Sequence, residues 1–102
     1  KIAMFKDSYH GNFDSVLGRA QNTDGDYQAV PIVDGITAGS VEDLVILDYA
    51  TEQTLAYLEE NLDEFAAILI EPVQSRHPEL QPASFLRKLR ELTEDRETIF
   101  IM

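Results

Sequence analysis

The sequence predicts an α/β domain in which helices flank a mostly parallel sheet. Short apolar runs recur along the chain without alternating polar residues, as in strands buried on both faces. Amphipathic helix patterns separate several of these runs. The resulting order is strand, short helix, loop, strand, helix, strand, helix, strand, and this alternation is typical of parallel sheets.

The first part of the chain is expected to open with a strand over residues 1–5, an apolar run followed by turn-prone polar residues. A short helix is expected over residues 14–19, with its N-cap at Asn12 or Asp14. Residues 21–39 are expected to be irregular, because they contain Gly25, Pro31, Gly35 and Gly39. A loop of this length is usually functional or mobile.

The second part continues with a predicted strand over residues 41–49. Thr51 is expected to cap a helix whose apolar face carries Leu55, Leu58, Leu62 and Phe65. Residues 66–70 predict a strand buried on both faces. Pro82 is expected in the first turn of a second helix that carries Phe85, Leu86, Leu89 and Leu92. The last predicted strand covers residues 98–102.

Size and charge limit the possible functions. The 102 residues suffice for one small domain. The chain carries 19 acidic and 8 basic residues, a net charge of −11, which disfavours nucleic acid and anionic membranes as partners. It contains no cysteine, and no apolar run approaches the roughly 20 residues of a membrane span. A cytoplasmic protein is the expectation, and both apolar ends look as if they were cut from a longer chain.

Several kinds of chemistry find no support in the sequence. Residues 22–26 superficially suggest a calcium loop, but the glycine is misplaced and a turn is the better interpretation. The two histidines, His10 and His77, lie in different loops, so no metal site is expected. Neither a nucleophile elbow around a serine nor a glycine-rich nucleotide-binding fingerprint occurs.

Two loops remain as candidates for a site. Ser8-Tyr9-His10-Gly11 follows the first strand, and Glu71-Pro72-Val73-Gln74 follows the strand over residues 66–70. In a parallel sheet both loops lie at the carboxyl edge, where ligands bind. The simpler alternatives are a core-edge tyrosine, a hydrogen-bonded loop histidine, and a glutamate that caps a helix or pairs with an arginine.

These two segments, together with Phe85-Leu86-x-x-Leu89-Arg90-x-Leu92-Thr93, resemble class III pyridoxal-phosphate-dependent aminotransferases in order and spacing. The nearest branch is the glutamate-1-semialdehyde aminomutase-like group. The run from Glu71 to Pro82 also resembles aminotransferase domains built into hybrid polyketide and nonribosomal peptide synthetases. The resemblance implies that residues 1–102 are an internal fragment of the large, cofactor-binding domain of a fold-type I enzyme.

The resemblance also implies roles for individual residues. Tyr9 would stack on the pyridine ring of pyridoxal 5'-phosphate, and His10 and Gly11 would complete that loop. Glu71 would lie near the cofactor, with Gln74 beside it. Arg76 stands where ω-aminotransferases often carry a second glutamate, and this departure disfavours an ornithine-type specificity.

The resemblance places the phosphate-binding residues, the aspartate facing the pyridine nitrogen and the Schiff-base lysine outside this chain. No catalytic residue is therefore expected within it, and the isolated fragment should be inactive. The whole enzyme, a homodimer by family pattern, would transfer an amino group from an amino-acid donor to a carbonyl acceptor. A β-keto thioester on an acyl carrier protein is one candidate acceptor. The alternative hypothesis is a non-catalytic acidic α/β interaction module that uses residues 21–39 as its contact surface.

Overall fold

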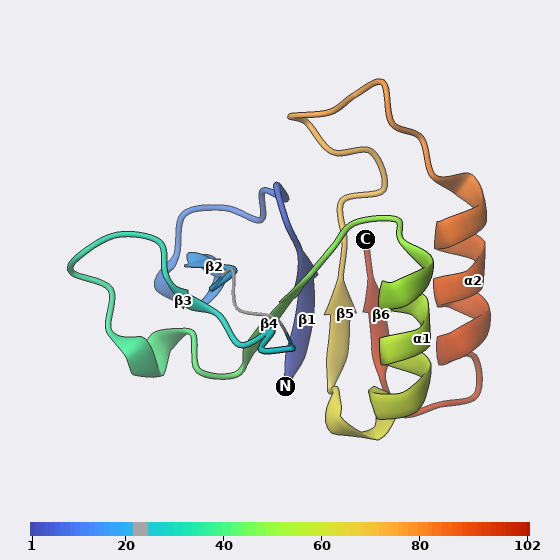
Figure 1. Ribbon diagram of the computed structural model, residues 1–102, viewed down its shortest axis with the longest axis horizontal. Helices are drawn as coiled ribbons and strands as arrows, with labels where there is room; N and C mark the ends of the chain where they lie inside the picture. The colour runs from blue at the N-terminus through green and yellow to red at the C-terminus, as the bar shows by residue number, and fades with distance from the viewer. Residues whose placement is uncertain (22–24) are drawn as a thin grey trace.

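A four-stranded sheet forms the centre of the protein in the computed structural model, which describes residues 1–21 and 25–102. Its strands lie in the order β4-β1-β5-β6, and neighbours are parallel throughout. The strands are β1 (Ile2–Phe5), β4 (Leu44–Leu47), β5 (Ala67–Leu69) and β6 (Ile99–Ile101). Figure 1 shows α1 (Glu52–Asn61) and α2 (Ala83–Thr93) side by side against this sheet. The predicted α/β class with a mostly parallel sheet is confirmed.

Both faces of the sheet carry a buried core over β1, β4 and β5, as the lack of alternation predicted, whereas Ile99 and Ile101 of β6 are exposed. Successive strand residues point to opposite faces, so each strand supplies side chains to two separate cores. The core on the helix side contains Ala3, Phe5, Val45, Leu47, Leu58, Ile68 and Leu89, among others. The core on the opposite side contains Met4, Ala29, Val41, Leu44 and Ile46. All four residues of β4 are buried for this reason.

The helices follow their sequence signals closely. The hydroxyl of Thr51 accepts a 3.1 Å hydrogen bond from the backbone N–H of Thr54, which confirms the predicted cap. α1 ends at Asn61 and continues as a 3₁₀ turn, η3 (Leu62–Glu64). Pro82, which was predicted in the first turn of α2, stands instead at its N-cap, one residue before the helix begins at Ala83. The predicted strands extend beyond the observed ones at their ends, by two or three residues at β4.

The predicted helix over residues 14–19 is wrong. Only a 3₁₀ turn forms there, η1 (Asp14–Val16), and its N-cap is Phe13 without a side-chain hydrogen bond. The following residues form β2 (Gly18–Arg19), which pairs antiparallel with β3 (Val30–Pro31). The backbone N–H of Ile32 donates to the carbonyl of Leu17 at 2.9 Å, so this pairing removes Leu17 from any helix.

Residues 21–39 are also less irregular than predicted, because they contain β3 and the start of η2 (Ala38–Ser40). The segment around Ala29 covers the outer edge of β4: Ala29 N–H donates to Leu44 at 3.0 Å, and Ile46 N–H donates to Tyr27 at 2.8 Å. Gly18 permits this arrangement, since a Cβ there would lie 2.8 Å from the Cβ of Ala29. Residues 22–24 of the predicted turn lie outside the described residues.

Within the described part of the chain, no helix is long and apolar enough to cross a membrane.

Candidate functional site

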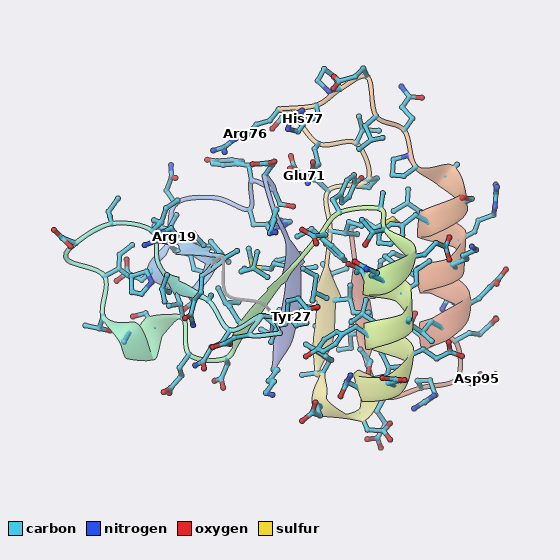
Figure 2. The ribbon with its side chains drawn as sticks, viewed as in Figure 1. Arg19, Tyr27, Glu71, Arg76, His77 and Asp95 are labelled. Atoms are coloured by element: carbon cyan, nitrogen blue, oxygen red, sulfur yellow. The ribbon has the colours of Figure 1, made fainter. Side chains whose placement is uncertain are left out.

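The candidate site lies at the carboxyl edge of the sheet, where β1, β4 and β5 end. The parallel register pairs Phe5 with Leu47 and Ile2 with Ala67, so the loops that follow these strands emerge on one side. Figure 2 shows Glu71, Arg76 and His77 in the loop above the sheet. The two predicted loops therefore meet, as the sequence indicated.

The loop after β1 requires two unusual backbone conformations. Asp7 has φ of +63° although it is not a glycine, and Gly11 has φ of +101°. Left-handed conformations are costly for residues with a Cβ, and they persist where surrounding contacts enforce them. Between these two positions the chain presents Ser8, Tyr9 and His10 at the end of the strand.

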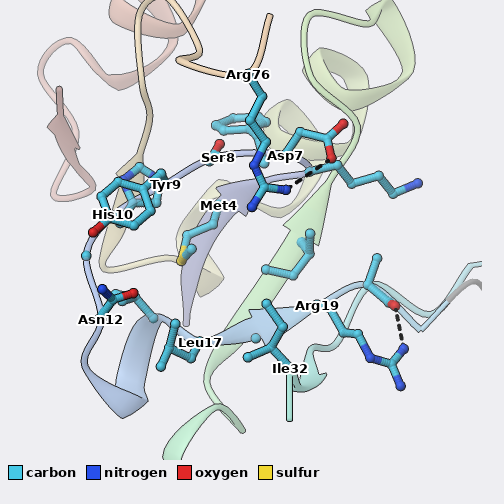
Figure 3. Close-up of a pocket in the computed structure, with 17 residues that line it drawn as sticks. Met4, Asp7, Ser8, Tyr9, His10, Asn12, Leu17, Arg19, Ile32 and Arg76 are labelled. Carbon is cyan, nitrogen blue, oxygen red and sulfur yellow. Dashed lines mark hydrogen bonds and ion pairs between the residues drawn. The ribbon is translucent and has the colours of Figure 1, made fainter.

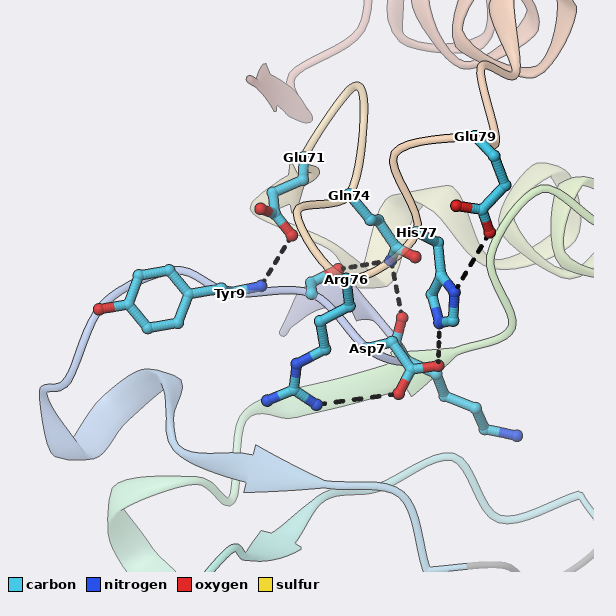
Figure 4. Close-up of polar contacts among 9 residues, drawn as sticks. Asp7, Tyr9, Glu71, Gln74, Arg76, His77 and Glu79 are labelled. Atoms are coloured by element: carbon cyan, nitrogen blue, oxygen red, sulfur yellow. Dashed lines mark hydrogen bonds and ion pairs between the residues drawn. The ribbon is translucent and has the colours of Figure 1, made fainter.

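The carboxylate of Glu71 supports this loop through the backbone. One oxygen, Oε2, accepts a 2.8 Å hydrogen bond from the backbone N–H of Tyr9 (Figure 4). The other, Oε1, accepts a 3.4 Å bond from Ser75 N–H. The Tyr49 hydroxyl donates to the carbonyls of Glu71 and Pro72, at 3.0 Å each. Burial raises the pKa of Tyr49, and the charge of Glu71 adds to the effect, so this hydroxyl stays protonated as a donor.

Gln74 fastens the two loops together from a buried position. Its side chain is 2% exposed, and its amide nitrogen donates to the Lys6 carbonyl at 2.8 Å and to the Ser8 hydroxyl at 3.2 Å. Buried polar groups usually find such partners, because an unpaired one is costly. Both Glu71 and Gln74 therefore hold the loop that carries Tyr9.

An exposed charged cluster extends the same junction. The Asp7 carboxylate lies 3.4 Å from Nε2 of His77 and 4.0 Å from Nη1 of Arg76 (Figure 4). The other ring nitrogen of His77 lies 3.6 Å from Glu79. Because these side chains are largely exposed, the pairs orient the loop more than they stabilise it. They also help to explain the left-handed conformation of Asp7, whose carboxylate faces the second loop.

A pocket of about 440 Å³ opens beneath these loops (Figure 3). Its walls combine an apolar base with polar and aromatic groups from both loops: Met4, Leu17, Ile32, Ile46, Tyr9, His10, Asn12, Arg19 and Arg76 are among them. The Tyr9 side chain is 53% exposed and therefore free to cover a ligand with its ring. A core-edge role for Tyr9 is not what the structure shows.

His10 lines this pocket and carries a buried polar atom, its ring nitrogen Nε2, without a hydrogen-bond partner among the described residues. Burial lowers the pKa of His10, and the nearby charge of Glu71 opposes that change without cancelling it. A neutral imidazole with an open nitrogen can donate to or accept from a bound polar ligand, depending on its tautomer.

The five residues that the sequence singled out meet at one junction but have different places in it. Tyr9, His10 and Gly11 line the pocket, whereas Glu71 and Gln74 do not line it and instead form hydrogen bonds to the loop after β1. Sequence reasoning missed Asp7 and Arg19, which line the same pocket. Asp7 is the second residue after the predicted strand over residues 1–5, which was an available signal, whereas Arg19 lay within the segment predicted as a helix. Within the described residues, no cluster of three or more potential metal ligands occurs.

No family model matches the chain, but individual proteins do. The chain is similar over 99% of its length to two glutamate-1-semialdehyde 2,1-aminomutases, from Acetivibrio thermocellus (34% identity) and Clostridium acetobutylicum (36% identity). Each match spans 24% of the relative, so the chain covers about a quarter of the length of these curated proteins.

Solved structures agree with these sequence matches. A transaminase with PLP bound has a TM-score of 0.76 and 28% identity, over 98% of this chain and 24% of that one. An omega-transaminase from Sphaerobacter thermophilus has a TM-score of 0.75 and 29% identity, over 98% of this chain and 25% of that one. The α/β fold of the chain thus matches one segment of transaminase structures.

Proposed function

We infer that this chain is a segment of a pyridoxal-phosphate-dependent class III aminotransferase, the group of enzymes that its sequence and fold match. Similarity to aminomutases and transaminases runs through 98–99% of the chain. We assign residues 1–102 to the large, cofactor-binding domain. The whole protein would move an amino group from a small-molecule donor to a carbonyl acceptor.

The observation that carries this proposal is the junction of the two loops over one pocket. Tyr9 offers an exposed ring, His10 offers a buried nitrogen without a partner, and Gly11 turns the backbone at the rim. An aromatic, phosphate-bearing pyridine cofactor needs such a flat wall and such polar contacts. The residues present therefore fit pyridoxal phosphate.

In this proposal Tyr9 stacks on the cofactor ring and His10 contacts it through Nε2, while Glu71 and Gln74 keep both residues in place. When bound, the cofactor acts as an electron sink for negative charge at the carbon next to the amino group. None of the three lysines fits the role of cofactor attachment. Each pairs with a carboxylate at the surface: Lys1 with Glu64, Lys6 with Asp48 and Lys88 with Glu52.

We further propose that the chain alone is inactive, because the attachment lysine lies elsewhere in the protein. A placement within a polyketide–peptide synthetase, with an acceptor on an acyl carrier protein, remains a prediction from the Glu71–Pro82 run. So does a homodimeric parent.

Borohydride trapping on the full-length protein tests the function. The protein is incubated with pyridoxal phosphate, reduced, and mapped by peptide mass spectrometry. We expect a single adduct on a lysine outside residues 1–102. An absence of any adduct, together with no absorbance at the Schiff-base band, would refute the proposal and favour the interaction module.

The role of Tyr9 is tested separately in the same protein. Tyr9→Ala removes the ring and should weaken cofactor binding by about two- to tenfold, since ring stacking contributes roughly 0.5–1.5 kcal/mol. Tyr9→Phe keeps the ring and should bind within about twofold of the wild type. Equal affinities of all three proteins in a fluorescence titration would exclude stacking by Tyr9.

A further inference from the structure

A groove on the helix side of the sheet lies apart from the candidate site. α1 and α2 form the outer layer on that side (Figure 1), and the groove between them has a volume of about 580 Å³. It shares no lining residue with the pocket beneath the loops. Its apolar part comes from Leu55 and Ala56 of α1 and Leu92 of α2. Both leucines are only partly buried against the core, so the packing of the two helices leaves apolar surface uncovered in the groove.

The rim of this groove is acidic. Four glutamates line it, against the two cations Lys88 and Arg96. Both cations already have partners, because Lys88 lies 3.1 Å from Glu52 and Arg96 lies 2.7 Å from Asp63, a residue outside the groove. The other three glutamates have no ion-pair partner among the described residues: Glu59, Glu91 and Glu94. Uncompensated carboxylates around apolar surface favour a ligand that is both basic and apolar.

The spacing of the lining residues on α1 favours a helix as this ligand. Glu52 and Glu59 are seven residues apart and enclose Leu55 and Ala56. Seven residues are about two helical turns, or roughly 10 Å. A helix with basic residues at positions i and i+7 and leucines at i+3 and i+4 has the same period with the opposite charge. Glu52 can take part although it pairs with Lys88, since its side chain is 84% exposed.

We propose that the groove between α1 and α2 docks a basic amphipathic helix of a partner protein. A second copy of this chain is disfavoured, because it presents the same acidic rim and a net charge of −11. Nucleic acid and anionic membranes are repelled for the same reason. A linear polyamine would meet the glutamates but leave Leu55 and Leu92 uncovered. The inference does not rest on the proposed function, since the groove and the candidate site have no lining residue in common.

Fluorescence anisotropy on the full-length protein tests the docking with a labelled helical peptide. The probe repeats Lys-Gln-Ala-Leu-Leu-Ala-Gln, which places its lysines seven residues apart. A control peptide of the same composition exchanges the first leucine of each repeat with the preceding alanine and so moves it to the opposite face. We expect a dissociation constant of about 1–100 μM for the probe, as for a small interface, and at least about tenfold weaker binding of the control peptide.

Charge reversal in the groove gives the second arm. Glu59→Lys should weaken binding of the probe at least about fivefold, because it replaces an attraction by a repulsion. Glu60→Lys makes the same change in net charge at an exposed neighbouring position of α1 outside the groove, and should change binding less than twofold. Glu91→Lys on α2 should act as Glu59→Lys does. All three positions are exposed, so the variants should fold, which thermal unfolding checks.

Carbodiimide coupling then locates the bound probe. Its lysines should couple to Glu59, Glu91 or Glu94 and not to Glu60. Coupling to Glu60 alone places the probe outside the groove and overturns the inference.

The remaining outcomes also decide the question. Equal binding of the two peptides, or equal losses in Glu59→Lys and Glu60→Lys, reduces the effect to overall charge and overturns the inference. Displacement of the probe by equimolar spermine assigns the groove to polyamines and overturns it as well. So does an absence of binding, and couplings from Glu59 to lysines elsewhere in the same protein would then show that its own chain fills the groove. Borohydride trapping of the cofactor is independent of all these results, so their failure leaves the proposed function intact.

Discussion

Gln74 offers the sharpest test of how the candidate site is held together. Its buried amide makes two hydrogen bonds, to the Lys6 carbonyl at 2.8 Å and to the Ser8 hydroxyl at 3.2 Å. Gln74→Met keeps a similar volume and removes both bonds. At a net contribution of about 1 kcal/mol each, the loss is about 2 kcal/mol in the free energy of local opening.

This loss corresponds to roughly 30-fold faster amide exchange in the loop after β1, since each 1.4 kcal/mol is a factor of ten. Hydrogen exchange with mass spectrometry on the full-length protein, at residues 6–11 and 73–77, measures it. Gln53→Met makes the same change at an exposed position of α1 and should leave both loops unchanged.

A further variant isolates the donor role of the amide. Gln74→Glu keeps the size but replaces the donor with a second acceptor that faces the Lys6 carbonyl, so it should open the loop at least as much as Gln74→Met. Wild-type exchange at residues 6–11 in both variants would refute the reasoning, because the two loops would then be joined by other contacts.

Glu71→Ala removes the acceptor of Tyr9 N–H and should speed exchange at that amide by about tenfold, and Glu71→Gln by less, because a neutral oxygen remains. Gly18→Ala brings a Cβ to 2.8 Å from that of Ala29 and should cost about 1–3 kcal/mol in thermal unfolding, whereas Gly39→Ala meets no atom within 4 Å and should not. His10 should titrate below its ordinary pKa of 6.5 in an NMR titration. The folded state then binds the proton less readily than the unfolded state, so stability should fall as the pH drops below about 6.5, and His10→Gln should reduce this dependence. A normal His10 midpoint would contradict its burial.

Much of the fold was accessible from local signals in the sequence. The strand over residues 66–70 was predicted from an apolar run alone, and Thr51 was predicted as a cap from its residue type and place. The same local reasoning failed at β2, which is two residues long and exists only because it pairs with β3 twelve residues later along the chain. A pairing between segments this far apart in the sequence produces no hydrophobic periodicity that a local pattern could reveal.

The candidate site, like the fold, was predictable from the sequence only in part. Tyr9 and Glu71 were expected at one edge because parallel strands share the direction in which they end, and the 2.8 Å hydrogen bond between them confirms their proximity. The left-handed backbone of Asp7 and the location of Arg76 above the pocket were not predictable. Both depend on contacts between residues roughly seventy positions apart, which no local propensity encodes.

The central place of β1 in the sheet has a consequence for how the protein is made. Ile2 pairs with Leu44 on one side and with Ala67 on the other, so β1 is synthesised well before either partner. At ribosomal speeds of about 5–20 residues per second, this apolar strand waits roughly 2–8 s for β4. During that interval its backbone groups are open to other chains. The yield of folded protein should therefore depend on chaperone capacity and on the rate of translation across residues 6–43, as well as on the stability of the finished domain.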